Sequence, residues 1–212
     1  MGKLSVEKKE AKKDKIIEKS MELFCEKGYH TTKVEEITKA LGISKGNFYT
    51  YFGSKEEVLY EILNIMKNER IKMLEEIDTD KAPKEILKTF IEDYIQFFFK
   101  YLSGANVDKG TNVNFDYNVI DHFLKDEKVL NYAEEIQDIL VDFLKKNIVE
   151  RIKESKNKEY NLRFISEFIL ASIEGFLLYE HLREKLRIDK KYEITIENKI
   201  DQITEFIYNA IK

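Results

Sequence analysis

The sequence predicts an all-α protein, and three observations lead to that prediction. The chain has 212 residues but only 8 glycines and 1 proline, which leaves little room for the many tight turns of an all-β fold. Apolar residues recur at three- and four-residue steps along most of the chain, the spacing of one helix face. Hydrophobic residues make up 43% and charged residues 36%, with 36 basic against 40 acidic, a composition typical of a folded helical protein.

The first amphipathic pattern covers residues 12–27 and predicts a helix that Gly28 ends. Thr32 and Glu35 then have the spacing of a capping box. Thr32 is therefore expected to begin a short second helix, which ends at Gly42.

A short third helix is expected to begin at Ser44, a suitable N-cap, and to end at Gly53. The glycine-containing turn before it makes the two short helices a helix-turn-helix candidate. Four aromatic residues crowd this third helix. Phe48 and Phe52 share a helix face and are expected to fill the core, whereas Tyr51 is left open between core and backbone contact.

The rest of the chain also has helical spacing. It predicts helices over residues 54–78, 83–102, 116–124, 129–154, 161–186 and 194–211. We expect two domains: an N-terminal three-helix domain over residues 1–53, with the start of a connecting helix to about residue 63, and a C-terminal helical domain over residues 64–212.

Charge is distributed unevenly between the two ends. Residues 1–55 contain 12 lysines against 8 acidic residues, while the remaining residues contain 24 basic against 32 acidic. A basic front on an acidic body is expected where only the front meets a polyanion, although lysines can also simply solvate helix faces.

Several functional classes find no support in the sequence. No apolar run is long enough to span a membrane and no signal peptide is evident, so we expect no membrane partner. Cys25 is the only cysteine, which together with the missing signal favours the cytoplasm. The three histidines have no metal-ligand spacing, and no phosphate loop, dinucleotide motif or nucleophile elbow occurs. We therefore expect no enzyme, no catalytic residue, no metal and no cofactor.

Residues 12–63 carry a dense set of position-specific residues. They are Gly28-Tyr29, Thr31-Thr32, Ile37, Leu41-Gly42-Ile43-Ser44-Lys45-Gly46, Tyr49, Tyr51-Phe52, Ser54-Lys55-Glu56 and Leu59. With these residues the segment resembles the N-terminal DNA-binding domain of the TetR family of transcriptional regulators. The resemblance covers about a quarter of the chain; the remainder matches only in length and helical pattern.

The resemblance implies that the third helix enters the major groove of DNA. The candidate DNA contacts are Thr32, Lys33, Ser44, Lys45, Gly46, Asn47, Tyr49, Thr50 and Lys55. Lys45 and Asn47 can reach base edges or phosphates. Gly46 costs about 1 kcal/mol of helix propensity relative to alanine, which close approach of the backbone to DNA would compensate. By resemblance, Tyr49 and Lys55 contact phosphates.

The resemblance further implies an effector-binding and dimerisation domain. The candidate ligand contacts are Tyr94, Phe98, Tyr101, Phe115, Tyr117, His122, Phe123, Phe143 and Glu174, which suggest a largely hydrophobic or aromatic effector, although each aromatic residue can equally be core. The candidate dimer contacts are Phe168, Ala171, Ser172, Gly175, Tyr179, Ile196, Ile200, Ile203 and Ile207, which would form a four-helix interface about a two-fold axis.

Taken together, these features predict a homodimeric transcriptional repressor. It would bind a palindromic DNA operator and be released by a small-molecule effector. Two alternatives stay open: a DNA-binding architectural protein without an effector, and a helical interaction protein that has lost DNA binding.

Overall fold

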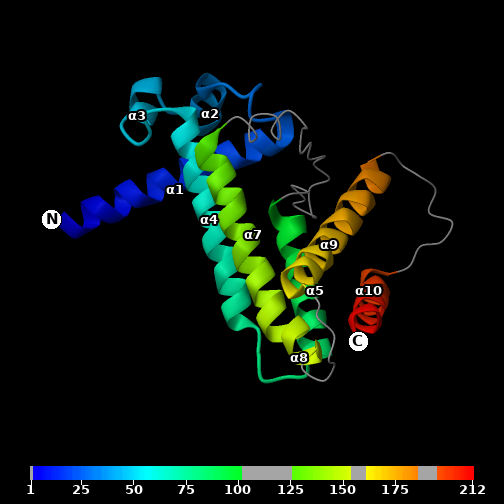
Figure 1. Cartoon of the computed structure of the whole chain (residues 1–212). Coiled ribbons are helices and arrows are strands. Elements are labelled where there is room, and N and C mark those ends of the chain that lie inside the picture. Colours follow the sequence, from blue (N-terminus) through cyan, green and yellow to red (C-terminus); the bar gives the residue numbers. More distant parts are fainter. Residues whose placement is uncertain (1, 102–125, 154–160, 186–194) are drawn as a thin grey trace. The chain divides into compact units, whose positions relative to one another are not determined.

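Helices form all the regular structure in the residues that the computed structural model describes, which are 2–101, 126–153, 161–185 and 195–212 (Figure 1). They are α1 (Gly2–Lys27), α2 (Val34–Leu41), α3 (Lys45–Tyr49), α4 (Lys55–Glu76), α5 (Pro83–Tyr101), α7 (Glu127–Leu144), the π-helical turn η1 (Lys145–Val149), α8 (Glu150–Lys153), α9 (Leu162–Lys185) and α10 (Ile196–Ile211). The predicted all-α fold, with an N-terminal helix-turn-helix followed by a helical region, is confirmed.

These helices form two compact units. Unit 1 comprises Met1–Asn68 and Lys100–Tyr132, and unit 2 comprises Glu69–Phe99 and Ala133–Lys212. Helices α4, α5 and α7 contribute residues to both units. The functional boundary expected near residue 63 stays a prediction.

The core of unit 1 joins the first four helices. Each of them contributes at least one buried apolar side chain, namely Ile16, Ile37, Phe48 and Val58 in chain order. Phe52 is buried in the same cluster, so the expectation that Phe48 and Phe52 fill the core is confirmed.

Helix α1 begins at Gly2, well before the predicted start at Lys12. Residues 7–12 are exposed and most of them are lysine or glutamate, which favour helix by propensity. Because they have no apolar face, hydrophobic periodicity cannot detect this part of the helix.

The core of unit 2 contains an aromatic stack. Phe90 of α5 lies against Tyr94 of the same helix, with ring centroids 5.6 Å apart, and against Phe143 of α7 at 5.9 Å. Helix α10 is joined to α5 at its surface by the ion pair between Lys88 and Asp201, which are 2.7 Å apart.

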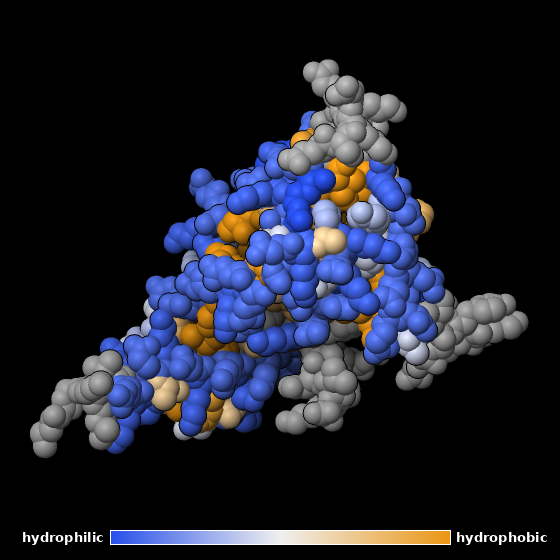
Figure 2. Space-filling view, turned by 90° about the horizontal axis from the view of Figure 1, so that it is seen from below, coloured by the Kyte–Doolittle hydropathy of each residue, from blue (hydrophilic) through white to orange (hydrophobic). Residues whose placement is uncertain are grey.

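On the face that Figure 2 shows, much of the surface is hydrophilic, and apolar residues reach it in separate patches. Within the described ranges, no helix is both long enough and apolar enough to cross a membrane.

Candidate nucleic-acid interface

The helix-turn-helix is formed by α2, the turn at Gly42 and α3. Gly42 has a φ of 65°, in the left-handed region that glycine favours. Its N–H donates to the carbonyl of Lys39 at 3.2 Å, and the N–H of Ile43 donates to that of Thr38 at 3.0 Å. These bonds cap the end of α2. Ile43 packs against the core of unit 1, and this contact fixes the direction in which the chain leaves the turn toward α3.

Helix α3 begins after Ser44, as the sequence predicts. The Ser44 Oγ accepts a hydrogen bond from the N–H of Asn47 at 3.1 Å, which is the usual N-cap geometry. At the other end, the Thr50 Oγ1 donates to the carbonyl of Asn47 at 2.6 Å. Both hydroxyl residues are exposed, so they remain available to a partner on the surface of α3.

The aromatic residues of α3 divide between core and surface. Phe48 is fully buried, and Tyr51 is partly buried against the same cluster. Tyr49 is 52% exposed, although it lies between them in the sequence. Lys45 and Gly46 are exposed as well, so α3 presents a cation, a bare stretch of backbone and a phenol to a partner.

The described residues around Gly46 do not require a glycine at this position. Among the described residues, apart from its chain neighbours and the backbone of its own helix, a Cβ atom at this position would have only the Ser44 Oγ within 4 Å, at 3.9 Å, and the backbone is not in the left-handed region. An alanine would therefore fit the free protein and favour the helix. The absence of a side chain matters only if something outside the chain approaches this backbone closely.

Lys45 forms an ion pair with Glu35 of α2. Both side chains are about half exposed, and the hydrogen bond from Lys45 lowers the pKa of the Glu35 carboxyl. In the free protein, the lysine expected to meet DNA is therefore held by a carboxylate of the neighbouring helix. Any polyanion must compete with Glu35 for it.

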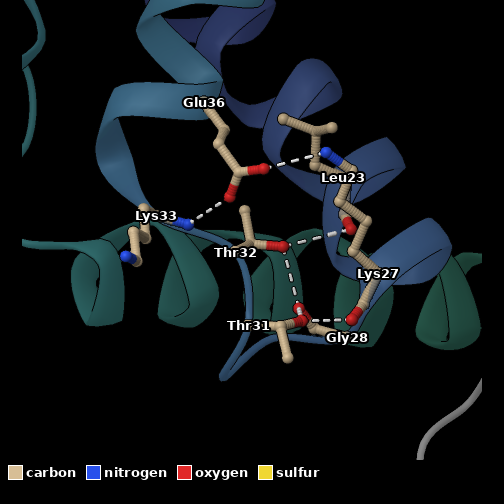
Figure 3. A network of polar contacts seen from close by, with 7 residues as sticks. All are labelled: Leu23, Lys27, Gly28, Thr31, Thr32, Lys33 and Glu36. Carbon is tan, nitrogen blue, oxygen red and sulfur yellow. Dashed lines mark hydrogen bonds and ion pairs between the residues drawn. The ribbon is translucent and has the colours of Figure 1, made fainter.

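The turn between α1 and α2 differs from the sequence prediction (Figure 3). Thr32 does not cap α2. It is 1% exposed, and its hydroxyl donates to the carbonyl of Gly28 at 2.8 Å and lies 3.2 Å from that of Leu23. The N-cap is Lys33, whose N–H donates to the Glu36 carboxylate at 2.9 Å.

The candidate DNA contact at Thr32 is therefore wrong, because its side chain is buried and its hydroxyl is used inside the protein. The Glu36 carboxylate also accepts from the Lys27 Nζ at 2.8 Å, which links the end of α1 to the start of α2. Lys33 is exposed and remains a candidate contact.

Lys55 already has partners inside the protein. Its ammonium donates to the carbonyls of Tyr29 at 2.6 Å and Thr32 at 2.9 Å, and it lies 4.1 Å from the centroid of the Tyr29 ring. Burial lowers its pKa. Lys55 therefore fastens the start of α4 to the turn between α1 and α2, and its phosphate contact stays a prediction.

The ligand candidates whose side chains are described all lie in unit 2. Tyr94 and Phe143 belong to the aromatic stack with Phe90, and Phe98 is buried. Glu174 of α9 is exposed, not buried, and accepts from the Tyr94 hydroxyl at 2.6 Å. Phe115, Tyr117, His122 and Phe123 lie outside the described residues, and so does the side chain of Tyr101.

The dimer candidates on α9 lie on its exposed face. Phe168 is 64% exposed and Tyr179 58%, and the small residues Ala171, Ser172 and Gly175 are exposed beside them. The opposite face of α9 is buried in unit 2. A helix with one buried face and one exposed apolar face has a surface that a partner can cover.

The candidates on α10 are divided differently. Ile200 and Ile207 are buried within unit 2, at 8% and 6% exposure, and Ile203 is partly buried. Only Ile196 of the four is exposed. Phe206 is 76% exposed. The exposed face of α10 is therefore not the seam that the isoleucine spacing suggests.

Sequence reasoning did not single out four residues that the structure draws attention to. Phe164, Leu178 and Phe206 are large apolar side chains on the exposed faces of α9 and α10, and Arg70 is a buried arginine of α4. Phe164 and Leu178 continue the three- and four-residue spacing of Phe168 and could have been included on that basis. Nothing in the local sequence marks Arg70. No cluster of three or more metal-ligating side chains occurs in the parts of the chain that the structure describes.

Comparison with known proteins agrees with this geometry. Residues 16–62, which span α2, α3 and parts of α1 and α4, match a family model described as "Bacterial regulatory proteins, tetR family". An uncharacterized HTH-type transcriptional regulator of Bacillus subtilis, YerO, is 31% identical over 145 residues, which are 62% of this chain and 50% of YerO. The match thus spans only half of that relative.

Two further comparisons cover nearly the whole chain. The fatty acid metabolism regulator protein of Bacillus subtilis is 25% identical over 197 residues, 89% of this chain and 91% of that protein. The crystal structure of the Bacillus subtilis regulator FadR, in complex with stearoyl-CoA, matches with a TM-score of 0.66 and 22% identity, covering 93% of this chain and 98% of FadR. At that identity the structural match shows the fold alone.

Proposed function

Because this chain belongs to the tetR family of bacterial regulatory proteins, we propose that it is a homodimeric repressor that is released from a palindromic operator by a small hydrophobic effector. In this proposal α3 of each protomer reads one half-site in the major groove. The proposed contacts are Lys33, Ser44, Lys45, Gly46, Asn47, Tyr49 and Thr50.

The surroundings of Gly46 are the observation that carries the DNA-binding proposal. Among the residues that the structure describes, an alanine would fit there without a clash. Glycine at an exposed helix position costs about 1 kcal/mol, so its presence is best explained by a partner that comes close to the backbone. Lys45 and Tyr49 flank this position with groups that bind phosphate or base edges.

Dimerisation through the exposed face of α9 and the adjacent α10 is supported by the size of the side chains there. Phe164, Phe168 and Leu178 of α9 and Phe206 of α10 are 47% or more exposed, at 62%, 64%, 47% and 76%. Apart from the neighbours and helix backbone of Gly175 itself, no atom of the described residues lies within 4 Å of where a Cβ would be, so a partner helix can come close at that point. Two helices from each protomer would then form a four-helix interface.

A fatty acyl effector is favoured by the names of the similar proteins. One is a fatty acid metabolism regulator, and the solved FadR structure contains stearoyl-CoA. A long acyl chain also suits the aromatic residues of unit 2 around Phe90. Helix α4 has residues in both units, so it is the proposed route by which an effector in unit 2 alters the position of α3.

The substitution Gly46→Ala tests the DNA contact. It is expected to raise the free energy of unfolding by about 1 kcal/mol and to weaken binding to DNA from upstream of the protein's own gene by about tenfold or more, because the new methyl group faces the duplex. Denaturation and gel-shift titration measure the two effects. Increased stability with unchanged affinity for DNA would refute the placement of Gly46 at the interface.

The substitution Phe168→Glu tests the dimer. Phe168 is exposed in the protomer, so the variant is expected to fold but to sediment as a monomer and to lose most of its affinity for a palindromic site. The matched control is Lys72→Glu, an exposed position of α4. A variant Phe168→Glu that stays dimeric would place the interface elsewhere.

A further inference from the structure

Arg70 of α4 is a buried cation in unit 2. It is 9% exposed, and its guanidinium carbon lies 4.4 Å from the centroid of the Phe97 ring and 5.7 Å from that of Tyr94. Aromatic faces attract a guanidinium, but they do not accept its in-plane N–H groups or neutralise its charge. A buried charge of this kind is unfavourable unless an anion pairs with it.

No such anion comes from the described part of the chain. None of its carboxylates forms an ion pair with Arg70, and the buried Nε of Arg70 has no hydrogen-bond partner there. Glu174 instead accepts from the Tyr94 hydroxyl. Burial, with nearby Glu92 and Glu76, raises the pKa of the Asp93 carboxyl, whereas a guanidinium counter-ion would lower it.

We propose that Arg70 binds the anionic head group of an amphipathic effector, a carboxylate or a phosphate, whose apolar part lies against the aromatic residues of unit 2. The planar guanidinium presents paired N–H groups that match either anion. The rings of Phe97 and Tyr94 lie beside that group. The inference rests on the proposed function, because it defines the chemistry of the effector that releases the regulator from DNA.

A series of ligands with one alkyl chain and different head groups tests the proposal. Dodecanoate, dodecyl phosphate, dodecanol and dodecyltrimethylammonium are titrated below their micellar concentrations into the DNA-free, full-length protein by isothermal calorimetry. The two anions are expected to bind about tenfold or more tightly than dodecanol, and the cation more weakly still. Comparing the two anions tells carboxylate from phosphate. Equal binding of dodecanol and both anions would overturn the proposal.

Two variants link this preference to Arg70. Arg70→Met is expected to remove the preference for anions while leaving the melting temperature of the free protein close to that of the wild type, because the uncompensated charge is gone. Arg70→Lys, which keeps the charge without the planar fork, is expected to keep part of the preference. The control is Arg163→Gln, which removes an exposed arginine of α9 that pairs with Asp138 and Glu167. It is expected to keep the full preference. A preference that survives in Arg70→Met would overturn the proposal.

Release from DNA is measured separately by gel shift with the same four ligands. If the anions bind through Arg70 but leave the complex with DNA intact, the proposed function fails and the anion site stands. If dodecanol releases the DNA as well as the anions do, the effector role stands and the anion site fails.

Discussion

Two segments of unit 1 have similar sequences but different roles: the turn from Gly28 to Lys33, and the start of α3 at Ser44 and Lys45. Each places a hydroxyl residue beside a lysine at the beginning of a short helix, and each was a candidate phosphate contact. In the turn, the Thr32 hydroxyl is hydrogen-bonded inside the protein. At α3, the residues that follow the cap are exposed. A hydroxyl cap followed by a lysine therefore predicts only where a helix starts. Burial decides whether these residues stabilise the fold or contact a partner.

Replacing Lys55 gives the largest expected change in this comparison. Lys55→Met keeps the aliphatic part of the side chain but removes the donor to the carbonyls of Tyr29 and Thr32. The free energy of unfolding is expected to fall by about 2–3 kcal/mol, as for hydrogen bonds from a charged group. Urea denaturation measures it. The exposed Lys39→Met serves as control and is expected to change stability by less than about 0.5 kcal/mol. Unchanged stability with weaker DNA binding would favour the phosphate contact of Lys55 instead.

Removing the buried hydroxyl of Thr32 is expected to have the next largest effect on the free energy of unfolding. Thr32→Val keeps the shape of the side chain and is expected to lower the free energy of unfolding by about 1–2 kcal/mol, because the buried hydrogen bond from the Thr32 hydroxyl to the carbonyl of Gly28 is lost. DNA affinity of the folded protein should not change. Thr31→Val is the matched control, since the Thr31 hydroxyl also bonds to the carbonyl of Gly28, at 3.1 Å, but the residue is exposed. Equal losses in both variants would mean that burial is not the deciding factor.

On the α3 side, removing the hydroxyl of Tyr49 should affect binding and not folding. The ring is 52% exposed, so Tyr49→Phe is expected to leave stability within about 0.5 kcal/mol of the wild type. DNA affinity is expected to fall about fivefold, the value of one lost hydrogen bond to a phosphate.

Gel shifts over a range of salt concentrations add a second criterion. Tyr49→Phe should keep the salt slope, whereas Lys45→Met should reduce it by about one per protomer. A stability loss without a binding loss would make Tyr49 a core residue.

The smallest expected effect concerns the pair between Glu35 and Lys45. Glu35→Gln releases Lys45 and is expected to increase DNA affinity roughly threefold, as for a weak surface pair. The lowered pKa of Glu35 means that the pair persists as the pH falls to the ordinary pKa of a glutamate. Mild acid is therefore not expected to release Lys45 as Glu35→Gln does. Glu22→Gln, which removes an exposed carboxylate of α1 paired with Lys19, is the control. Equal gains in DNA affinity in both variants would mean that the effect comes from the change in net charge and not from the release of Lys45.

The local features of unit 1 could be predicted because their causes lie within a few residues of one another. The Ser44 cap joins residues three apart, and the shared face of Phe48 and Phe52 follows from helix geometry. The clamp of Lys55 could not be predicted in this way. Its acceptors are 26 and 23 residues away in sequence, and only the packing of the turn against α4 brings them to the ammonium.

Unit 2 shows the same limit on a larger scale. The spacing of Ile200 and Ile207 identifies an apolar face of α10, but a periodic pattern does not say what covers that face. The tertiary structure uses it inside the protomer and leaves Phe206 exposed. Arg70 appears in sequence as one charge among many on a long helix, and its burial depends on aromatic residues of α5 that lie over it.

By itself, the sequence determined the helical class, the helix-turn-helix with its glycine turn, and the aromatic residues that fill its core, because these depend on short-range spacing and backbone preference. Tertiary structure alone decided which caps and lysines are used internally, which face of α9 stays open, and that Arg70 is buried without a carboxylate partner in the described residues. Burial and the pairing of distant polar groups arise only when helices pack. The sequence pattern of a helix does not show which neighbour its apolar face will contact.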